Sequence, residues 1–204
     1  MAYAIRRVGQ DEWERLRALR LAALADTPIG FGMRYADALH LPDEYWQDRA
    51  RREATESRSA LFVAAQEGSG EWVGMAGGFL ADELSYYWQA GRERLVIFSV
   101  FVDPGHRGRA RGVNVLLFDA VVGWAGVEHP SAQITLGVHE DNARAYAFYQ
   151  RYGFVDTGRA VPYNLEESST VLLMDYQPGS GVGGGDSVSG IPRPCALPPG
   201  GLGQ

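Results

Sequence analysis

The sequence predicts one α/β domain over residues 1–176, with helices packed around a mixed sheet. Two observations support this fold class. Hydrophobic residues make up 46% of the 204 residues and aromatic residues 11%, which is enough to bury a core. The apolar positions also switch repeatedly between the period of a strand and the period of a helix. The predicted order of elements is β-α-α-β-β-β-α-β-α-β-β.

The first half of the chain shows three strand patterns and two helix patterns. The strands are predicted at residues 3–8, 61–66 and 72–80, and the helices between Asp11 and Pro28 and over residues 35–53. Asp11 and Glu14 match a capping box at the start of the first helix. Pro42 interrupts the second helical stretch. The turn-forming residues 67–70 join the last two strands into a hairpin.

The second half is more informative. Residues 94–102 (RLVIFSVFV) form a continuous apolar run, which predicts a central strand buried on both faces. Pro104 and Gly105 end this strand, and the helix after Gly112 keeps its apolar residues at helical spacing. The remaining elements are a strand at 134–138, a helix opened by Asn142 and ended by Gly153, and strands at 154–158 and 170–176.

Composition excludes several classes of function. The net charge of -6 argues against a dedicated nucleic-acid binder, which needs a basic face. A single cysteine, Cys195, cannot form an internal disulfide or a cysteine zinc site. No apolar run approaches the roughly 20 residues of a membrane helix, and the start lacks a signal peptide's apolar core. We expect a cytoplasmic protein without metal, nucleic-acid or membrane partners.

The last 28 residues, 177–204, differ from the rest of the chain. They contain nine of the 26 glycines and five of the 10 prolines, with only scattered apolar residues. Such a segment cannot bury enough surface to offset its ordering entropy. We predict a flexible tail that follows the folded domain.

A turn of glycines and arginines lies directly before the helix of the second half. The first backbone N–H groups of a helix lack intrahelical partners and lie at the positive end of its dipole, so they bind phosphate. Small residues and arginines alternate in this turn: Arg107, Gly108, Arg109, Ala110, Arg111 and Gly112. The pattern matches neither a P-loop nor a GxGxxG motif. The alternative interpretation is a solvated turn that binds nothing.

The helix after Asn142 carries a second group of candidate residues. At about 100° per residue, Asn142 and Tyr149 return to the same helix face, about 10 Å apart along the axis. A phenol, with an ordinary pKa of about 10, can donate a proton to a departing thiolate. The alternative is that Tyr149 is a buried aromatic residue whose hydroxyl is satisfied by a protein partner.

Together the two segments resemble the acyl-CoA signature of the GNAT superfamily of N-acyltransferases. Val102-Asp103-Pro104 and residues 107–112 resemble its strand end and the pattern [QR]-x-x-G-x-[GA]. The later pattern N-x-x-A-x-x-[FL]-Y-x-x-x-G-F is matched by Asn142, Ala145, Phe148, Tyr149, Gly153 and Phe154. The resemblance covers residues 3–176 and implies a mostly antiparallel sheet that is splayed at its centre.

The resemblance also implies a function and a set of residue roles. The function is transfer of the acetyl group of acetyl-CoA to a primary amine, with Tyr149 as the catalytic proton donor. Backbone groups of residues 100–102 would polarise the thioester carbonyl, and those of residues 108–113 would hold the pyrophosphate. The implied cofactor-binding residues are Val100, Phe101, Val102, Arg107, Gly108, Arg109, Ala110, Arg111, Gly112, Val113 and Asn142.

Two departures from the family pattern concern binding and catalysis. Ala110 replaces the inner glycine of the first motif, and Gly137 stands where some relatives have a glutamate general base. The base would then come from elsewhere, be a water chain, or be unnecessary for an amine that arrives neutral. Nearby candidates are Glu83, His139 and Glu140, and we expect His139 to lie in an exposed loop.

The acceptor remains open among small amines, amine-bearing antibiotics and protein N-termini. We expect the helices of residues 11–53 to shape its site, and the family implies a possible homodimer. The acidic residues that could attract a cationic amine, or be ordinary surface carboxylates, are Asp82, Glu83, Glu140 and Asp141. Two alternatives stay open: a non-catalytic acyl-CoA-binding regulatory module, and an interaction domain built on the arginine turn.

Overall fold

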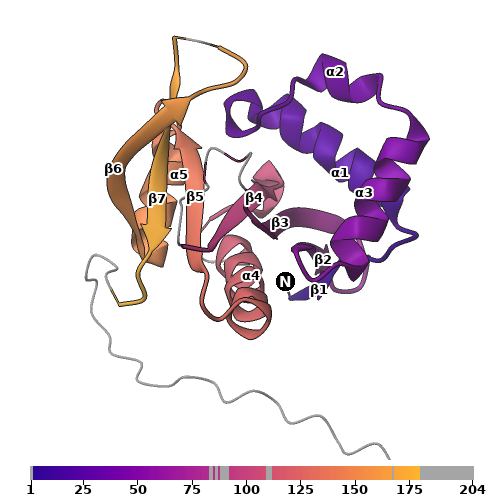
Figure 1. Cartoon of the computed structure of the whole chain (residues 1–204). Coiled ribbons are helices and arrows are strands. Elements are labelled where there is room, and N and C mark those ends of the chain that lie inside the picture. The colour runs from indigo at the N-terminus through magenta and orange to yellow at the C-terminus, as the bar shows by residue number, and fades with distance from the viewer. Residues whose placement is uncertain are drawn as a thin grey trace, which may run out of the picture.

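A computed structural model of the chain describes residues 2–82, 85, 87, 92–108, 112–166 and 168–179. Over these residues a seven-stranded sheet has the order β1-β2-β3-β4-β5-β7-β6 (Figure 1). The strands are β1 (Tyr3–Arg7), β2 (Ser59–Gln66), β3 (Trp72–Leu80), β4 (Arg94–Val102), β5 (Gln133–His139), β6 (Phe154–Pro162) and β7 (Thr170–Tyr176). Among the described strands, β4 and β5 pair in parallel and every other neighbouring pair is antiparallel.

Helices cover both faces of this sheet. They are α1 (Trp13–Asp26), α2 (Tyr35–Leu39), α3 (Asp43–Thr55), α4 (Val113–Glu128) and α5 (Ala143–Tyr152), with short 3₁₀ turns at Pro28–Gly30 and Pro104–His106. In Figure 1, α1, α2 and α3 lie together on one side of the β1–β4 half. Among the described residues, none of these helices combines the length and the apolar character that a membrane span requires.

Alternation along β2 shows how the two faces are filled. Leu61 and Val63 belong to the core cluster that includes α1 and α3, whereas Ala64 belongs to the cluster around α4 and α5. Successive side chains of a strand point to opposite faces, so one short strand contributes to both cores. The sheet is therefore the shared middle layer of a three-layer α/β structure.

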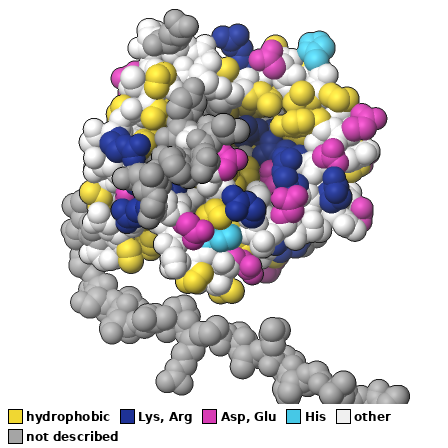
Figure 2. All heavy atoms as spheres, in the orientation of Figure 1, with side chains coloured by type: hydrophobic (Ala, Val, Ile, Leu, Met, Phe, Trp, Pro, Cys, Tyr) yellow, Lys and Arg dark blue, Asp and Glu magenta, His cyan; other side chains and the backbone are white. Residues whose placement is uncertain are grey.

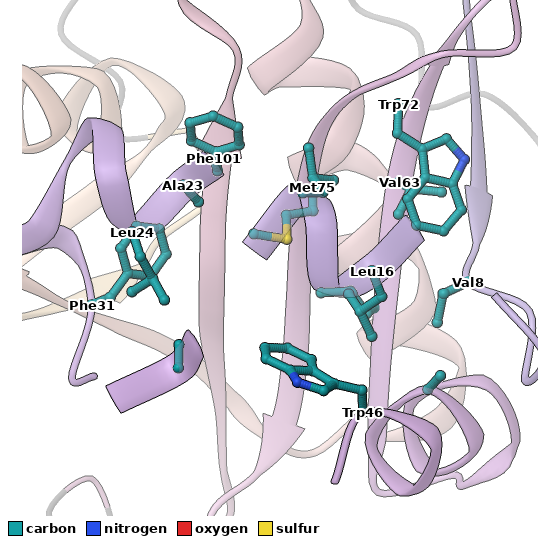
Figure 3. Packing of buried hydrophobic residues seen from close by; sticks show 14 residues of the cluster. Val8, Leu16, Ala23, Leu24, Phe31, Trp46, Val63, Trp72, Met75 and Phe101 are labelled. Carbon is teal, nitrogen blue, oxygen red and sulfur yellow. The ribbon is translucent and has the colours of Figure 1, made fainter. Parts of the chain in front are cut away.

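The core under α1 and α3 contains fully buried large side chains (Figure 3). Trp46 of α3, Leu16 of α1 and Met75 of β3 each have 0% exposure. Burial of a side chain of this size contributes about 1.5–3 kcal/mol relative to its exposed state. This packing fixes α1 and α3 against β2–β4, and both helices carry side chains of the candidate site.

The expected fold class and order of elements are confirmed, and two local predictions are wrong. Asp11 does not cap α1: Glu12 is the N-cap residue, and its carboxylate accepts hydrogen bonds from the Gly9 amide at 2.8 Å and from Arg6. The strand predicted to end at Gly158 runs on to Pro162. Gly158 has a φ of 71° within a register shift of β6, so it marks a bulge rather than a strand end.

Candidate active site

Strands β4 and β5 diverge halfway along their length. Their paired residues run from Arg94↔Gln133 to Ile97↔Leu136. Beyond this point, among the described residues, Phe98–Val102 pair only with β3 and Gly137–His139 only with β7. A cavity of about 590 Å³ lies at the divergence and is lined by both strands. We call it the first cavity.

A bulge in β4 coincides with the divergence. Ser99 and Val100 together lie opposite Ala76 of β3, and Ser99 adopts a left-handed φ of 55° that is rare for any residue except glycine. The Ser99 hydroxyl oxygen accepts hydrogen bonds from Arg20 Nη1 at 3.1 Å and Arg49 Nη2 at 3.0 Å. Side chains from α1 and α3 therefore hold the bulge in place.

The first cavity brings together the predicted site residues that the structure describes. Its walls include Val100, Phe101, Val102, Arg107, Gly108, Gly112, Val113, Asn142 and Tyr149. Arg109, Ala110 and Arg111 lie outside the described residues. Residues from β4, the following turn, α4 and α5, far apart in the sequence, thus line one space.

The N-terminus of α4 lines this cavity. Gly112 is the N-cap residue with a φ of 64°, a conformation that glycine adopts without strain, and no side chain caps the helix. Val113 and Val115 of the first turn line the cavity. The first-turn N–H groups of a helix lack intrahelical acceptors, so this end of the cavity suits an anion.

Arg107 anchors the turn that precedes α4. Its Nε donates to the Val102 carbonyl oxygen at 2.6 Å, and its guanidinium forms an ion pair with Asp26 at the end of α1. Burial tends to raise the pKa of Asp26, but hydrogen bonds from Arg107 and Thr27 outweigh this effect and lower it. Arg107 therefore positions the turn in addition to lining the cavity.

Asn142 and Tyr149 both lie in the cavity wall contributed by α5. Asn142 is the N-cap of α5, and its Oδ1 accepts a hydrogen bond from the Ala145 amide at 3.1 Å. The side-chain NH₂ of Asn142 remains as a donor. Gly153 ends the helix with a φ of 115°, as its glycine predicted.

Tyr149 is buried, with 7% exposure, among the rings of Phe118, Phe148 and Phe154 at centroid distances of 5.7, 5.7 and 6.1 Å. Its hydroxyl has no hydrogen-bond partner within the described residues, whereas the Tyr152 hydroxyl donates to Asp119 at 2.8 Å. Burial, followed by proximity to Tyr87, raises the pKa of Tyr149. The Tyr149 phenol therefore stays protonated at neutral pH and lines the cavity.

Comparisons with known proteins agree with this geometry. The model of the acetyltransferase (GNAT) family matches residues 12–154 of the chain. The chain belongs to the GNAT acetyltransferase family. A search of curated proteins gave no match.

Solved structures show the same GNAT fold at low sequence identity. An acetyltransferase of the GNAT family from Streptococcus pneumoniae has a TM-score of 0.66 at 18% identity, covering 85% of this chain and 98% of its own. NAA60 of Arabidopsis thaliana, in complex with a bisubstrate analogue, has a TM-score of 0.59 at 18% identity, and the match covers 86% of this chain and 97% of NAA60. PaiA N-acetyltransferase of Thermoplasma acidophilum, in complex with coenzyme A, has a TM-score of 0.60 at 14% identity, covering 86% and 100%.

At the position where the family resemblance implies a glutamate in some members, this GNAT chain has Gly137 beneath a tyrosine. A Cβ on Gly137 would lie 2.5 Å from the Tyr87 hydroxyl oxygen and 2.5 Å from Val171 Cγ1. Both distances are far below van der Waals contact. No side chain fits at residue 137 in this arrangement, and the Tyr87 phenol occupies the adjacent space.

Two other candidates for a general base, His139 and Glu140, do not line the first cavity. His139 is buried, with its ring 4.8 Å from that of Tyr163, so the expectation of an exposed loop histidine is wrong. It is the last residue of β5 and lines neither this cavity nor the one described next. Glu140 accepts a hydrogen bond from the Thr170 amide at 2.8 Å, and Glu83 lies outside the described residues.

A second cavity of about 600 Å³ meets the first at the β4 bulge. The two share wall residues Gly30, Phe31, Ile97, Phe98, Ser99 and Gly137. Helices α1 and α3 contribute Arg20, Arg49 and Glu53 to the second cavity, and each of these is more than 90% buried. The GNAT fold of this chain thus has two connected spaces with Ser99 between them.

Sequence reasoning did not identify Ser99, Arg20 or Arg49. Two of them, Ser99 and Arg20, nevertheless had a signal in the sequence. Ser99 is the polar residue inside the apolar run of residues 95–102. Arg20 follows Leu16 and precedes Ala23 and Leu24 on the buried stripe of α1, where an apolar residue is normally expected.

Proposed function

We propose that the protein is an acetyl-CoA-dependent N-acetyltransferase whose acceptor is a primary amine. The observation that carries the proposal is the first cavity. It combines the divergence of β4 from β5, the backbone end of α4 and the protonated phenol of Tyr149. The complexes solved for members of the same fold, with coenzyme A and with a bisubstrate analogue, support this choice of co-substrate.

The residues of the first cavity fit an acyl-CoA molecule. A pantetheine arm carries amides, and the backbone of residues 100–102, which pairs on one side only among the described residues, offers matching donors and acceptors. A pyrophosphate matches the first-turn amides of α4, beside Gly108 and Gly112 of the preceding turn. Arg109, Ala110 and Arg111 belong to this proposed set, and the Asn142 amide would contact the arm near the thioester.

Acetyl transfer in this site needs no covalent enzyme intermediate. The neutral amine nitrogen attacks the thioester carbonyl carbon, the new C–N bond forms, and the C–S bond breaks. Backbone N–H groups of β4 stabilise the negative charge that develops on the carbonyl oxygen. Tyr149 donates its proton to the departing sulfur, the amine loses a proton to water, and Tyr149 is reprotonated from water. The products are an N-acetyl amide and free coenzyme A.

The test has two stages. Calorimetry with acetyl-CoA measures binding, and a panel of amines then measures turnover through the release of free thiol. The panel contains small amines, an amine-bearing antibiotic and a peptide with a free N-terminus. Binding with amine-dependent thiol release supports the proposal, whereas the absence of acetyl-CoA binding refutes it.

A non-catalytic acyl-CoA-binding module is the second candidate. The observation that favours it is Gly137, because this position carries no carboxylate and a Cβ there would clash with Tyr87 and Val171 as they now stand. Acetyl-CoA binding without thiol release for any amine would support this candidate.

A further inference from the structure

The second cavity is basic, although the chain as a whole carries a net charge of -6. Within the part of the chain that the structure describes, its charged wall residues are four arginines and two carboxylates: Arg20, Arg49, Arg52, Arg58, Glu53 and Asp82. Figure 2 shows basic side chains inside a hollow on the face beside α1 and α3. A local excess of positive charge in a concave site concentrates anions there.

Arg20 carries a buried charge that no carboxylate of the described residues pairs with directly; Glu53 acts on it only through a longer-range attraction. Arg20 is 8% exposed, and its guanidinium carbon lies 4.3 Å from the centroid of the Phe31 ring. Nη1 donates to Ser99, but the buried Nε has no hydrogen-bond partner. Within the described residues, no carboxylate lies within ion-pairing distance of Arg20. A buried charge in this state costs free energy unless a ligand compensates it.

The second buried arginine does not remove this imbalance. Arg49 Nε donates to Glu53 Oε1 at 2.9 Å, whereas Glu53 Oε2 is buried without a hydrogen-bond partner and only raises the pKa of Arg20 from a distance, so the one buried carboxylate of the group pairs directly with Arg49. Burial and the neighbouring charge of Arg49 lower the pKa of Arg20 to about 9. Two guanidiniums and one carboxylate therefore leave a net positive charge beside Ser99.

We propose that the acceptor amine also carries an anionic group, with a carboxylate as the simplest case, and that Arg20 binds this group in the second cavity. The proposal rests on the acetyltransferase function proposed above and specifies its substrate class. A guanidinium offers several N–H donors in a planar fork that matches a carboxylate. Arg20 has donors left for this purpose because Ser99 engages only Nη1.

The position of Arg20 also explains how the amine of the acceptor would reach the first cavity. Ser99 belongs to the walls of both cavities, and Arg20 contacts Ser99 from the second cavity. An acid group held at Arg20 would keep the amine of the same small molecule near the bulge, where the first cavity begins. A volume of about 600 Å³ is suited to a small molecule. Amino acids and other short amino carboxylates have this combination of groups, whereas a polyamine would be repelled.

The proposal is tested with matched pairs of amines that differ only in charge. Each pair is an amino acid and its carboxamide, with phosphoethanolamine as the phosphate arm and spermidine as the cationic control. Binding is measured by calorimetry, and kcat/KM is measured by thiol release at a saturating concentration of acetyl-CoA. We expect kcat/KM for the preferred acid to exceed that of its amide at least tenfold.

Variants of α1 show whether Arg20 provides the preference. R20Q should reduce the ratio of kcat/KM for the acid to kcat/KM for its amide toward one. R20K should restore part of this ratio, because the charge returns without the planar fork. R17Q is the matched control: Arg17 lies on the same helix, pairs with Asp43 at 3.0 Å and lines neither cavity. It should keep the wild-type ratio. Circular dichroism and acetyl-CoA binding show that each variant is folded.

The outcomes separate this proposal from the function on which it rests. Failure to bind acetyl-CoA refutes the proposed function. If the protein binds acetyl-CoA but acetylates amides or spermidine with the same kcat/KM as the acids, only the proposed substrate class is overturned. A preference for phosphoethanolamine over the amino acids supports an anionic acceptor and identifies phosphate as its acid group. Equal binding of acid and amide, with no turnover of either, also overturns the proposal.

Discussion

The hydroxyl oxygen of Tyr87 lies 2.5 Å from the point where a Cβ on Gly137 would stand. At the wall that the two cavities share, the Tyr87 phenol therefore stands where a side chain of residue 137 in β5 would lie. Burial raises the pKa of Tyr87, so this hydroxyl is neutral at physiological pH. It can donate a hydrogen bond, but it does not act as a general base in the way that a carboxylate would.

A methyl group at residue 137 should destabilise the protein. G137A places the new Cβ against both Tyr87 and Val171, and overpacking of this kind costs about 1–3 kcal/mol. Urea unfolding measures the change. G123A is the control, because Gly123 lies in α4 with no atom within 4 Å of the new Cβ. Its stability should be unchanged or higher, and a G137A protein as stable as G123A would contradict the packing described here.

The overall fold was predictable from the sequence because its elements depend on local patterns. The run of residues 94–102 had the composition of a central strand, and Gly153 marked the end of α5. The bulge at Ser99 was not predicted, because its conformation depends on hydrogen bonds from Arg20 and Arg49, which are 79 and 50 residues away. Periodicity within one element carries no information about such distant partners.

The two cavities of the candidate site differ in how far the sequence predicts them. The predicted residues of the first cavity lie in two short motifs whose spacing is visible in the sequence, namely residues 100–113 and 142–149, whereas wall residues such as Phe31 and Gly137 come from elsewhere in the chain. The second cavity is assembled from residues of α1, α3, β2, β3, β4 and β5 and of the loops between them, with no shared sequence motif. The sequence-based emphasis on acidic residues was therefore incomplete: Asp82 lines the second cavity, while Glu140 and Asp141 line neither cavity.

Y149F should lower turnover without weakening acetyl-CoA binding. The change removes the hydroxyl that would protonate the sulfur and leaves the buried ring in place, so kcat should fall about 10²-fold or more. Calorimetry should give an unchanged Kd. The control is Y146F on the same helix: the Tyr146 hydroxyl bonds Asp156 and lines neither cavity. A Y149F enzyme with the kcat of Y146F would exclude Tyr149 as the proton donor.

The raised pKa of Tyr149 predicts a specific pH profile. A general acid acts in its protonated form, so its contribution is present below its pKa and is lost as the pH rises through that value. Burial moves the pKa above the ordinary value of about 10 for a phenol. We therefore expect no decline of kcat from this group up to pH 10, after correction for thioester hydrolysis. A decline centred near pH 9 in the wild type but not in Y149F would refute this.

Ser99 variants should separate backbone strain from hydrogen bonding. S99A removes the oxygen that accepts from two buried guanidiniums and keeps the left-handed φ, so it should cost about 1–3 kcal/mol. S99G also loses the oxygen but relieves the strain, and should be about 1 kcal/mol more stable than S99A. Thermal and urea unfolding measure both differences. S99A with wild-type stability would show that the shared oxygen contributes nothing to the bulge.

R20M should stabilise the ligand-free protein while it removes the selectivity for acids. Methionine fills similar volume without a buried charge, and replacing buried ionic groups with apolar ones can stabilise by about 1–4 kcal/mol. The lost hydrogen bond to Ser99 offsets part of this, so we expect a gain of about 1 kcal/mol at pH 7.

The gain from R20M should depend on pH with a definite sign. The folded-state pKa of Arg20, about 9, lies well below the ordinary value of an arginine, so the unfolded chain binds more protons between these two values. Wild-type stability then rises with pH across that window relative to R20M. The advantage of R20M is complete below pH 9 and should be smaller at pH 10 than at pH 7 in urea unfolding. A loss of stability in R20M at pH 7 would mean that the charge of Arg20 is already compensated within the protein, which would remove the reason for an anionic acceptor.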